Sequence, residues 1–311
     1  MSNMDFQAFL ETHQLPASYL DHAFAHFKIL IDDCLRRQQR SSPIVIGING
    51  CQGSGKSTLA AFLQEVFEQQ HHLKVVNISL DDFYLSKADR AEKARHIHPL
   101  LATRGVPGTH DIELAHQTLG ALLAGKRPRI SRFNKAEDDL LPKNKWDTAP
   151  EKVQLIILEG WCLGAQAQTE QQLARPVNVL EQEQDPKGIW RHYVNQQLKA
   201  GYRKLFDMVD CLVMLKAPAF DNVLQWRLEQ ENKLAKKLQK QAHENRDQPS
   251  SGLMSPQEIE YFIQFFQRIT EHILEEMPER ADHCYYLDSQ RQITHERHYA
   301  SVTTAGDTDI Y

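Results

Sequence analysis

One eight-residue segment, residues 50–57, constrains the fold of this chain more than any other. It reads Gly-Cys-Gln-Gly-Ser-Gly-Lys-Ser, which matches in full the Gly-x-x-x-x-Gly-Lys-Ser/Thr pattern of a phosphate-binding loop, the Walker A motif. An apolar run, Ile44 to Ile48, precedes the segment, and an amphipathic helical pattern follows it over residues 59–67. A glycine-rich turn would match by accident in about 1% of chains of this length, from average residue frequencies. The motif in this setting of strand and helix therefore predicts nucleotide binding.

Each part of this loop contributes to the binding of a triphosphate. The glycines allow a tight turn that points successive N–H groups inward, at the positive end of the following helix. Lys56 is expected to reach the β- and γ-phosphates and to offset the charge that builds up during transfer, while the Ser57 hydroxyl binds Mg²⁺. We therefore predict ATP and Mg²⁺ as cofactors. The predicted ATP-binding residues are Gly50, Cys51, Gln52, Gly53, Ser54, Gly55, Lys56, Ser57 and Thr58.

Short apolar runs separated by helical patterns predict one parallel sheet with helices on both faces, because strands that alternate with helices form βαβ units. The five predicted strands are residues 44–48, 75–80, 153–158, 211–215 and 284–287. A helix over residues 17–37 is expected to pack on this core as part of an N-terminal helical extension, residues 1–40. No boundary between independent domains is visible. We therefore predict a single α/β domain over residues 1–311.

Carboxylates close two of the predicted strands, at the edge where ligands bind in open parallel sheets. Asp81 and Asp82 follow the second run, and Glu159 follows the third. A carboxylate beside the γ-phosphate can accept the proton of an attacking hydroxyl, and we predict that role for Asp81. Asp82 is expected to lie near the metal or to be structural, and Glu159 to hold Mg²⁺ opposite Ser57. The alternatives are that the aspartates cap the next helix and that Glu159 faces solvent.

Composition and charge indicate a small-molecule partner. The formal net charge of −5 gives no basic surplus that would attract nucleic acid or an anionic membrane surface. Five scattered cysteines without a CxxC pair suggest neither a disulfide framework nor a zinc site. No apolar run approaches the roughly 18 residues of a membrane span, and the first residues lack the pattern of an export signal. We expect a cytoplasmic protein, either a monomer or a homodimer, that binds neither nucleic acid nor membranes.

A turn-rich segment, residues 95–111, carries polar side chains suited to an acceptor substrate. Arg104 suits a carboxylate, because its planar guanidinium can donate two parallel hydrogen bonds. His110 and Asp111 could fix substrate hydroxyls. The alternative is an ordered loop in which Arg104 pairs with a surface acid and Asp111 caps the next helix.

Residues 144–147, Asn-Lys-Trp-Asp, match the NKxD motif that reads guanine in GTPases. In GTPases this motif follows the Walker B strand, whereas here it precedes Glu159 and no apolar strand leads into it. We interpret the match as a coincidence, because motifs outside their structural context are often false positives.

Several segments resemble the D-glycerate 3-kinases and their bacterial and fungal kinase-like relatives, within the uridine kinase and phosphoribulokinase group of P-loop kinases. The Walker A motif is common to many NTPases, and the Asp-Asp-Phe-Tyr of residues 81–84 to that wider group. The specific part is residues 103–111, Thr-Arg-Gly-Val-Pro-Gly-Thr-His-Asp, and the resemblance continues through residues 158–161 and 226–231. It implies a P-loop NTPase kinase fold and transfer from ATP to a sugar-like acid or alcohol, with Asp81 as the base.

The resemblance also implies a mobile lid helix, which supplies cations to the transferred phosphoryl group and excludes water. The matching stretch, residues 219–253, contains Arg227, which could equally be a helix-surface residue. The residues predicted to bind the acceptor are Asp82, Tyr84, Arg104, His110, Asp111, Arg132 and Lys135. The segment 132–140 departs from the family pattern, with Asn134 in place of Asp and Leu140 in place of Arg. No chloroplast transit segment like that of plant members is visible, which favours a bacterial-type relative.

The sequence therefore predicts an ATP-dependent phosphotransferase with an alcohol group as acceptor, similar to D-glycerate 3-kinase. Lys56, Asp81 and Arg227 are the predicted catalytic residues. One alternative is a kinase for another acceptor, such as a nucleoside, pantothenate or a sugar. The other is a regulatory module that binds a nucleotide without transferring phosphate.

Overall fold

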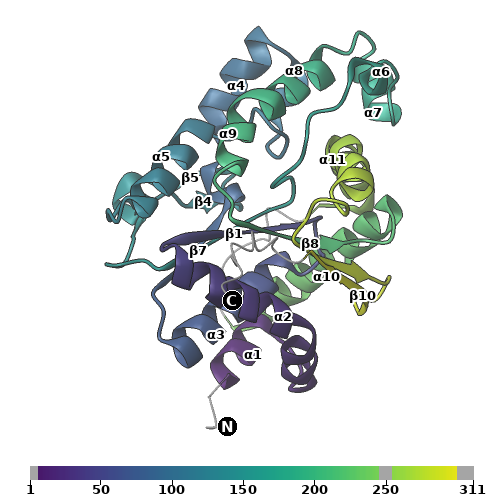
Figure 1. The fold of residues 1–311 in the computed structure, drawn as a ribbon. Helices are drawn as coiled ribbons and strands as arrows, with labels where there is room; N and C mark the ends of the chain where they lie inside the picture. The colour runs from purple at the N-terminus through teal and green to yellow at the C-terminus, as the bar shows by residue number, and fades with distance from the viewer. Residues whose placement is uncertain (1–5, 245–253, 300–311) are drawn as a thin grey trace, which may run out of the picture.

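The computed structural model describes residues 6–244 and 254–299 of the 311-residue chain and is built on a six-stranded sheet (Figure 1). The strands, in sheet order, are β10 (Ile293–His298), β9 (His283–Leu287), β8 (Cys211–Lys216), β1 (Ile44–Gly50), β7 (Leu155–Gly160) and β2 (Val75–Ser79). Neighbours from β9 to β2 run parallel, and β10 pairs antiparallel with β9. The five predicted parallel strands are confirmed. The apolar runs did not predict the sixth strand, β10.

Helices cover both faces of this sheet, as predicted. Figure 1 shows α2 and α3 on one face and α5 and α9 on the other. All residues of β1 are buried, because β7 and β8 flank it and helices lie above and below. The helices are α1 (Gln7–His13), α2 (Ser18–Arg40), α3 (Lys56–His71), α4 (Lys87–His96), α5 (Ile112–Leu123), α6 (Glu170–Leu173), α7 (Val179–Gln184), α8 (Ile189–Gln197), α9 (Arg203–Phe206), α10 (Phe220–Glu244) and α11 (Pro256–Glu276).

An aromatic cluster joins the N-terminal helices to the core. The ring of Phe62, which is fully buried in α3, lies 5.2 Å from that of Phe24 and 6.1 Å from that of Phe27, both on α2. Phe9 of α1 approaches the same ring at 6.2 Å. Aromatic pairs at these separations stabilise beyond the area they bury. The predicted helix over residues 17–37 therefore corresponds to α2 and packs on the sheet through α3.

Two short antiparallel ribbons lie between α5 and β7 in the chain. β3 (Arg129–Ile130) pairs with β6 (Asp147–Thr148), and β4 (Phe133–Asn134) pairs with β5 (Asp139–Leu140). Residues 144–147, the NKxD match, run from a 3₁₀ turn (Lys143–Lys145) to the first residue of β6, and not from the end of a strand of the large sheet. Their position agrees with the interpretation of that match as a coincidence.

The helices that follow β8 include the stretch predicted as a lid. α10 covers the first part of that stretch and continues to Glu244, and residues 245–253 lie outside the described residues. α11 begins with Pro256 in its first turn and with reciprocal hydrogen bonds between Ser255 and Glu258, which form a capping box. Among the helices that the structure describes, none combines the length and the apolar character needed to cross a bilayer.

Candidate active site

The predicted phosphate loop and two predicted carboxylates meet at one edge of the sheet. β1, β7 and β2 are neighbours and run parallel, so their carboxyl ends lie at the same edge. The register places Glu159 of β7 beside Ile48 of β1 and Ser79 of β2. The loop follows β1, and Asp81 follows β2 in a 3₁₀ turn, Leu80–Phe83. The expected convergence of the loop, Asp81 and Glu159 is therefore found.

The loop between β1 and α3 has the backbone geometry of a phosphate nest. Gly53 and Gly55 have φ angles of +78° and +94°, a region that favours glycine. A Cβ atom at Gly53 would lie 2.7 Å from Cβ of Trp226, so the loop is packed tightly against α10 at that point. A Cβ atom at Gly55 would meet nothing within 4 Å, so open space lies beside the start of α3 at Lys56. Backbone N–H groups at such a helix start bind polyphosphate.

Ser57 and Glu159 form a candidate metal site. Ser57 Oγ donates to Glu159 Oε1 at 2.9 Å, and Lys56 Nζ lies 3.9 Å from Oε2. Glu159 is 6% exposed, and its Oε2 has no hydrogen-bond partner among the described residues. Hydroxyl and carboxylate oxygens suit Mg²⁺, and a buried oxygen without a partner calls for a ligand. The two side chains predicted as metal ligands therefore fit a magnesium ion.

Asp81 is held by two hydrogen bonds. Tyr84 Oη donates to Oδ1 at 2.9 Å, and Lys135 Nζ donates to Oδ2 at 2.7 Å. Burial acts to raise the pKa of Asp81, but the ammonium groups of Lys135 and Lys56 outweigh burial and hold the pKa well below its usual range. The carboxylate is therefore ionised and oriented. Such a group can accept a hydrogen bond from an attacking hydroxyl.

A buried pair, His110 and Tyr202, adjoins Tyr84. The His110 ring stacks on the Tyr84 ring at 4.3 Å, and its Nδ1 lies 2.6 Å from Tyr202 Oη. Burial lowers the pKa of His110 to about 4, so the ring is neutral near pH 7. The sequence indicated His110 but not Tyr202, which lies 92 residues further along the chain in no recognisable motif.

Another side of the phosphate loop is held by α10 and by the turn between β9 and β10. Trp226 is fully buried against Gly53. Arg291, in the turn, donates from Nε to the carbonyl oxygen of Gly53 at 2.7 Å, and its guanidinium lies 5.0 Å from the centre of the Trp226 ring. Arg291 also pairs with Glu229 of α10 at 2.7 Å. The sequence analysis missed Arg291, because no local pattern marks a residue whose partner is 238 positions away.

Arg227, the predicted lid cation, follows Trp226 on α10. Its Nη2 lies 2.8 Å from Oε2 of Glu231, one turn further along the helix. Glu231 is 5% exposed and also accepts a hydrogen bond from the N–H of Met254. The structure therefore pairs Arg227 within its own helix, and a contact with a transferred phosphoryl group stays a prediction.

A cavity of about 790 Å³ opens beside the loop. Its walls are loop residues 53–58, parts of α1 and α2, the middle of α10 and the turn at residues 290–292. Asp81 and Glu159 do not line this cavity. Lys56 therefore stands between two regions, the wide cavity and the edge that carries the carboxylates.

Comparison with known proteins agrees with this geometry. The model of the phosphoribulokinase/uridine kinase family matches residues 45–178. The uncharacterized kinase mug58 of Schizosaccharomyces pombe is 32% identical over 228 residues, which cover 68% of this chain and 80% of that protein. The chain belongs to the phosphoribulokinase/uridine kinase family.

Two further similarities concern D-glycerate 3-kinases. The chloroplastic D-glycerate 3-kinase of Arabidopsis thaliana is 32% identical over 199 residues, which are 61% of this chain and 41% of the plant protein. The structure of D-glycerate 3-kinase from Cryptococcus neoformans superposes with a TM-score of 0.72 at 23% identity, over 86% of this chain and 96% of that one, which shows the fold. As a member of a family of ATP-dependent kinases, the chain is a P-loop small-molecule kinase.

In this phosphoribulokinase/uridine kinase family member, Arg104 does not present a free guanidinium. Its Nη1 pairs with Asp138, and its guanidinium lies 5.5 Å from the centre of the Phe133 ring. Asp138 also pairs with Arg90, at 2.9 Å. The structure thus agrees with the alternative in which Arg104 pairs with an acid, although a quarter of its side chain (25%) stays exposed.

Three other predicted acceptor residues of this kinase have structural bonds. Arg132 pairs with Asp82, whose Oδ1 also accepts the N–H of Phe133 at 3.4 Å, so the second ribbon is tied to the turn that carries Asp81. Asp111 caps α5 by accepting the N–H of Leu114 at 3.0 Å. This cap is the alternative expected for Asp111, and contacts of these side chains with a substrate stay predictions.

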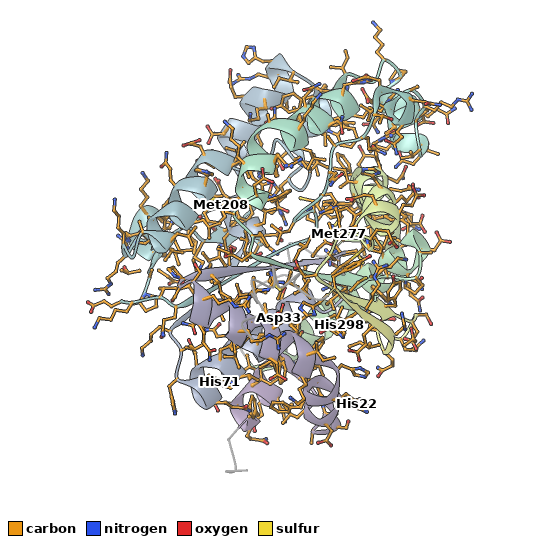
Figure 2. The ribbon with its side chains drawn as sticks, viewed as in Figure 1. His22, Asp33, His71, Met208, Met277 and His298 are labelled. Carbon is orange, nitrogen blue, oxygen red and sulfur yellow. The ribbon has the colours of Figure 1, made fainter. Side chains whose placement is uncertain are left out.

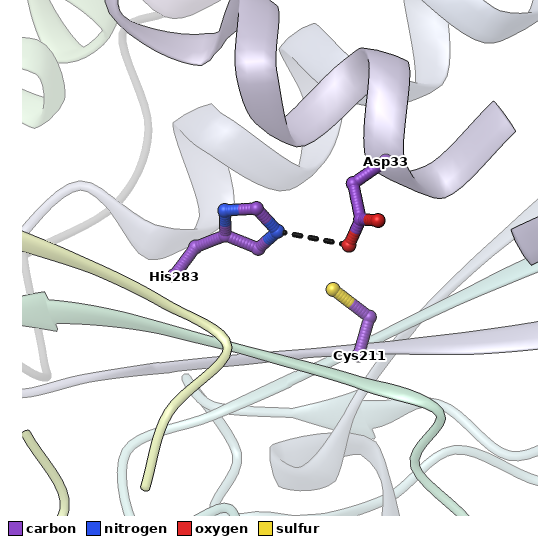
Figure 3. A group of neighbouring side chains, drawn as sticks. All are labelled: Asp33, Cys211 and His283. Carbon is purple, nitrogen blue, oxygen red and sulfur yellow. Dashed lines mark hydrogen bonds and ion pairs between the residues drawn. The ribbon is translucent and has the colours of Figure 1, made fainter. Parts of the chain in front are cut away.

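A separate polar cluster of this kinase lies at the other edge of the sheet. Asp33, Cys211 and His283 come together where β8 and β9 begin (Figure 3). The other ring nitrogen of His283, Nδ1, lies 2.8 Å from Nδ1 of His298, which Figure 2 labels together with Asp33. The Asp33 carboxylate accepts from His283 Nε2 at 3.1 Å and from Arg37 Nε at 2.9 Å. The guanidinium of Arg37 already supplies the positive charge that a metal ion would bring, so we assign no metal to this cluster.

Proposed function

We propose that this kinase transfers the γ-phosphate of ATP to a hydroxyl of a small sugar-acid-like metabolite, with D-glycerate as the leading acceptor. The observation that carries the proposal is the position of Asp81 beside Lys56 of the phosphate loop and within 2.7 Å of Lys135 on the second ribbon. An acceptor with a carboxylate can bind Lys135 while its hydroxyl approaches Asp81. The two relatives named as D-glycerate 3-kinases support this choice.

The phosphate end of the site would act through three side chains. Lys56 stabilises the negative charge of the β- and γ-phosphates as the bond to the leaving group breaks. Ser57 and Glu159 hold Mg²⁺, which when bound neutralises phosphate charge. The nucleoside would occupy the cavity of about 790 Å³ that residues 53–58 and 290–292 help to line.

The acceptor end would act through Asp81 and the cations around it. Asp81 orients the hydroxyl toward the γ-phosphate and takes its proton as the new bond forms. Lys135 is 62% exposed and Arg104 is 25% exposed, so an incoming carboxylate can reach both cations. Arg227 stabilises the transferred group once it leaves Glu231.

The test is acceptor-dependent formation of ADP with D-glycerate, L-glycerate, pantothenate, uridine and common sugars. D-glycerate is expected to give the highest kcat/KM. Lys135→Gln should raise the KM of acidic acceptors by about tenfold or more and that of neutral acceptors much less, as expected for loss of a charged hydrogen bond. The kcat for both classes of acceptor should fall, because Lys135 also holds Asp81. Phosphorylation of a neutral acceptor alone, with no response to acids, would overturn the sugar-acid proposal.

A further inference from the structure

The hydrogen bonds around His110 define which ring nitrogen carries its proton. Tyr202 Oη accepts the backbone N–H of Gly108 at 3.0 Å and also faces the backbone N–H of His110, and it lies 2.6 Å from His110 Nδ1. The Gly108 N–H is a donor and cannot take the phenol proton. The Tyr202 hydroxyl therefore donates to Nδ1. Burial also raises the pKa of Tyr202 well above its usual value, so the phenol keeps this proton.

A neutral histidine that accepts at Nδ1 carries its single proton on Nε2. The His110 side chain is 4% exposed, and its Nε2 has no hydrogen-bond partner among the described residues. A buried N–H without a partner is unfavourable unless a ligand or water satisfies it. The Nε2–H group is therefore a buried hydrogen-bond donor that lacks an acceptor among the described residues.

The same ring is joined to the proposed acceptor site. His110 stacks on Tyr84 at 4.3 Å, and the hydroxyl of Tyr84 donates to Asp81. The charge of Asp81 reaches His110 and acts to raise the pKa of the ring, although burial dominates. An acceptor hydroxyl on Asp81 would thus bring its neighbouring oxygen atoms toward the histidine.

We propose that Tyr202 holds His110 as the Nε2–H tautomer, so that the ring donates a hydrogen bond to an oxygen atom of the phosphoryl acceptor. The identity of the acceptor in this inference rests on the proposed function. The tautomer of His110 does not, because it is a property of the apo protein. Tyr202 closes a π-helical turn, Leu198–Tyr202, and such turns occur often at functional sites. Tyr202 is thus a positioning residue, whereas His110 contacts the substrate.

The tautomer is tested without any activity, by NMR of the apo protein labelled with ¹⁵N-histidine. The His110→Gln spectrum assigns the signals of His110 by their absence. The wild-type ring is expected to show a protonated Nε2 and an unprotonated Nδ1, and Tyr202→Phe to give a mixture of tautomers. Tyr193→Phe, which removes a hydroxyl bound to Lys93 at 3.2 Å, is the matched control and should leave the tautomer unchanged. A wild-type ring protonated at Nδ1 would overturn the inference.

The donor role is tested by two amides that place an N–H group differently. Glutamine at position 110 can bring its amide to the place of Nε2, whereas the shorter asparagine reaches only the place of Nδ1. His110→Gln is expected to keep the acceptor KM within about threefold, and His110→Asn and Tyr202→Phe to raise it about tenfold, with smaller changes in kcat. Equal KM values for the two amides would rule out the donor role.

Failure of this inference is distinguishable from failure of the proposed function. If no acceptor stimulates ADP formation, the kinase proposal fails, while the NMR spectrum still decides the tautomer. If an acceptor is found and the Nε2–H tautomer is absent, the kinase proposal stands and the role of Tyr202 is overturned. Denaturant midpoints of each variant identify any that do not fold.

Discussion

Ser57 Oγ and Glu159 Oε1 lie 2.9 Å apart, although the two residues are 102 positions apart in the chain. The contact joins the first turn of α3 to the end of β7, and it exists because β1 and β7 are parallel neighbours. The Oε2 atom of the same carboxylate has no hydrogen-bond partner among the residues that the structure describes. This arrangement fits the proposed magnesium site, because Oε2 stays available to the ion.

Glu159→Gln removes the charge of this carboxylate while its shape is kept. We expect the concentration of Mg²⁺ that gives half-maximal activity to rise about 10- to 100-fold, the range found when groups that tune a metal site are changed. The measurement is a Mg²⁺ titration of ADP formation at saturating ATP. An unchanged titration curve would remove Glu159 from the metal site.

Asp81→Asn keeps the hydrogen bond from Tyr84 but removes the proton acceptor. Turnover is expected to fall about 10²- to 10⁴-fold, the contribution typical of general bases, with little change in nucleotide affinity. Steady-state kinetics and calorimetric titration with ADP check the two halves of this expectation. The base assignment is wrong if turnover stays within about tenfold of the wild type.

Sequence patterns predicted the parts of this molecule that have local signatures. The five buried parallel strands appear as continuous apolar runs, and the phosphate loop has its spacing of glycines, lysine and serine. β10 was not predicted, because its residues, Ile-Thr-His-Glu-Arg-His, do not form an apolar run. Each element with a strong local pattern was therefore placed correctly.

Contacts between distant segments were not predictable in the same way. Tyr202 and Arg291 bind partners 92 and 238 positions away, and nothing in their neighbouring residues indicates it. Arg104 was predicted to hold a carboxylate of the substrate, and the structure pairs it with Asp138 of the ribbon 34 positions further on. The sequence thus indicated which kind of group a side chain can bind, whereas the tertiary fold determined which partner it binds.

His110 should make folding stability depend on pH. Its pKa is lowered from 6.5 to about 4 by burial, so the unfolded chain binds a proton between these values and the folded chain does not. The stabilisation is present above about pH 6.5 and is lost as the pH falls toward 4. The free energy of unfolding is expected to fall by up to about 1.4 kcal/mol per pH unit in this window.

His110→Gln is the matched variant for this pH dependence, because glutamine does not titrate. Urea unfolding of both proteins at several pH values gives the slope for each. The slope of the free energy of unfolding against pH should be smaller for the variant, by up to the about 1.4 kcal/mol per pH unit that one bound proton contributes. Parallel slopes would show that His110 is protonated in the folded state or is not buried there.

Gly53→Ala should destabilise the protein. The φ angle of +78° is costly for an L-residue by about 1–2 kcal/mol, and the new Cβ would lie 2.7 Å from Cβ of Trp226. Gly120→Ala is the control, because Gly120 lies inside α5 with nothing within 4 Å of an added Cβ, and it should stabilise by about 0.5–1 kcal/mol. Thermal unfolding compares the two, and a stable Gly53→Ala protein would contradict the tight contact between loop and α10.

Arg291→Ala tests whether the turn between β9 and β10 pre-forms the phosphate loop. The guanidinium donates to the carbonyl of Gly53 at 2.7 Å and packs on Trp226, so its loss should leave the loop free to adopt conformations that do not bind phosphate. Because a charged hydrogen bond is removed, affinity for ADP is expected to fall about tenfold, while kcat at saturating ATP changes less. Arg297→Ala on neighbouring β10 removes a guanidinium that pairs with exposed Glu279 at 2.9 Å, and it should leave ADP affinity unchanged. Equal affinities of the two variants, measured by calorimetry, would mean that α10 alone holds the loop.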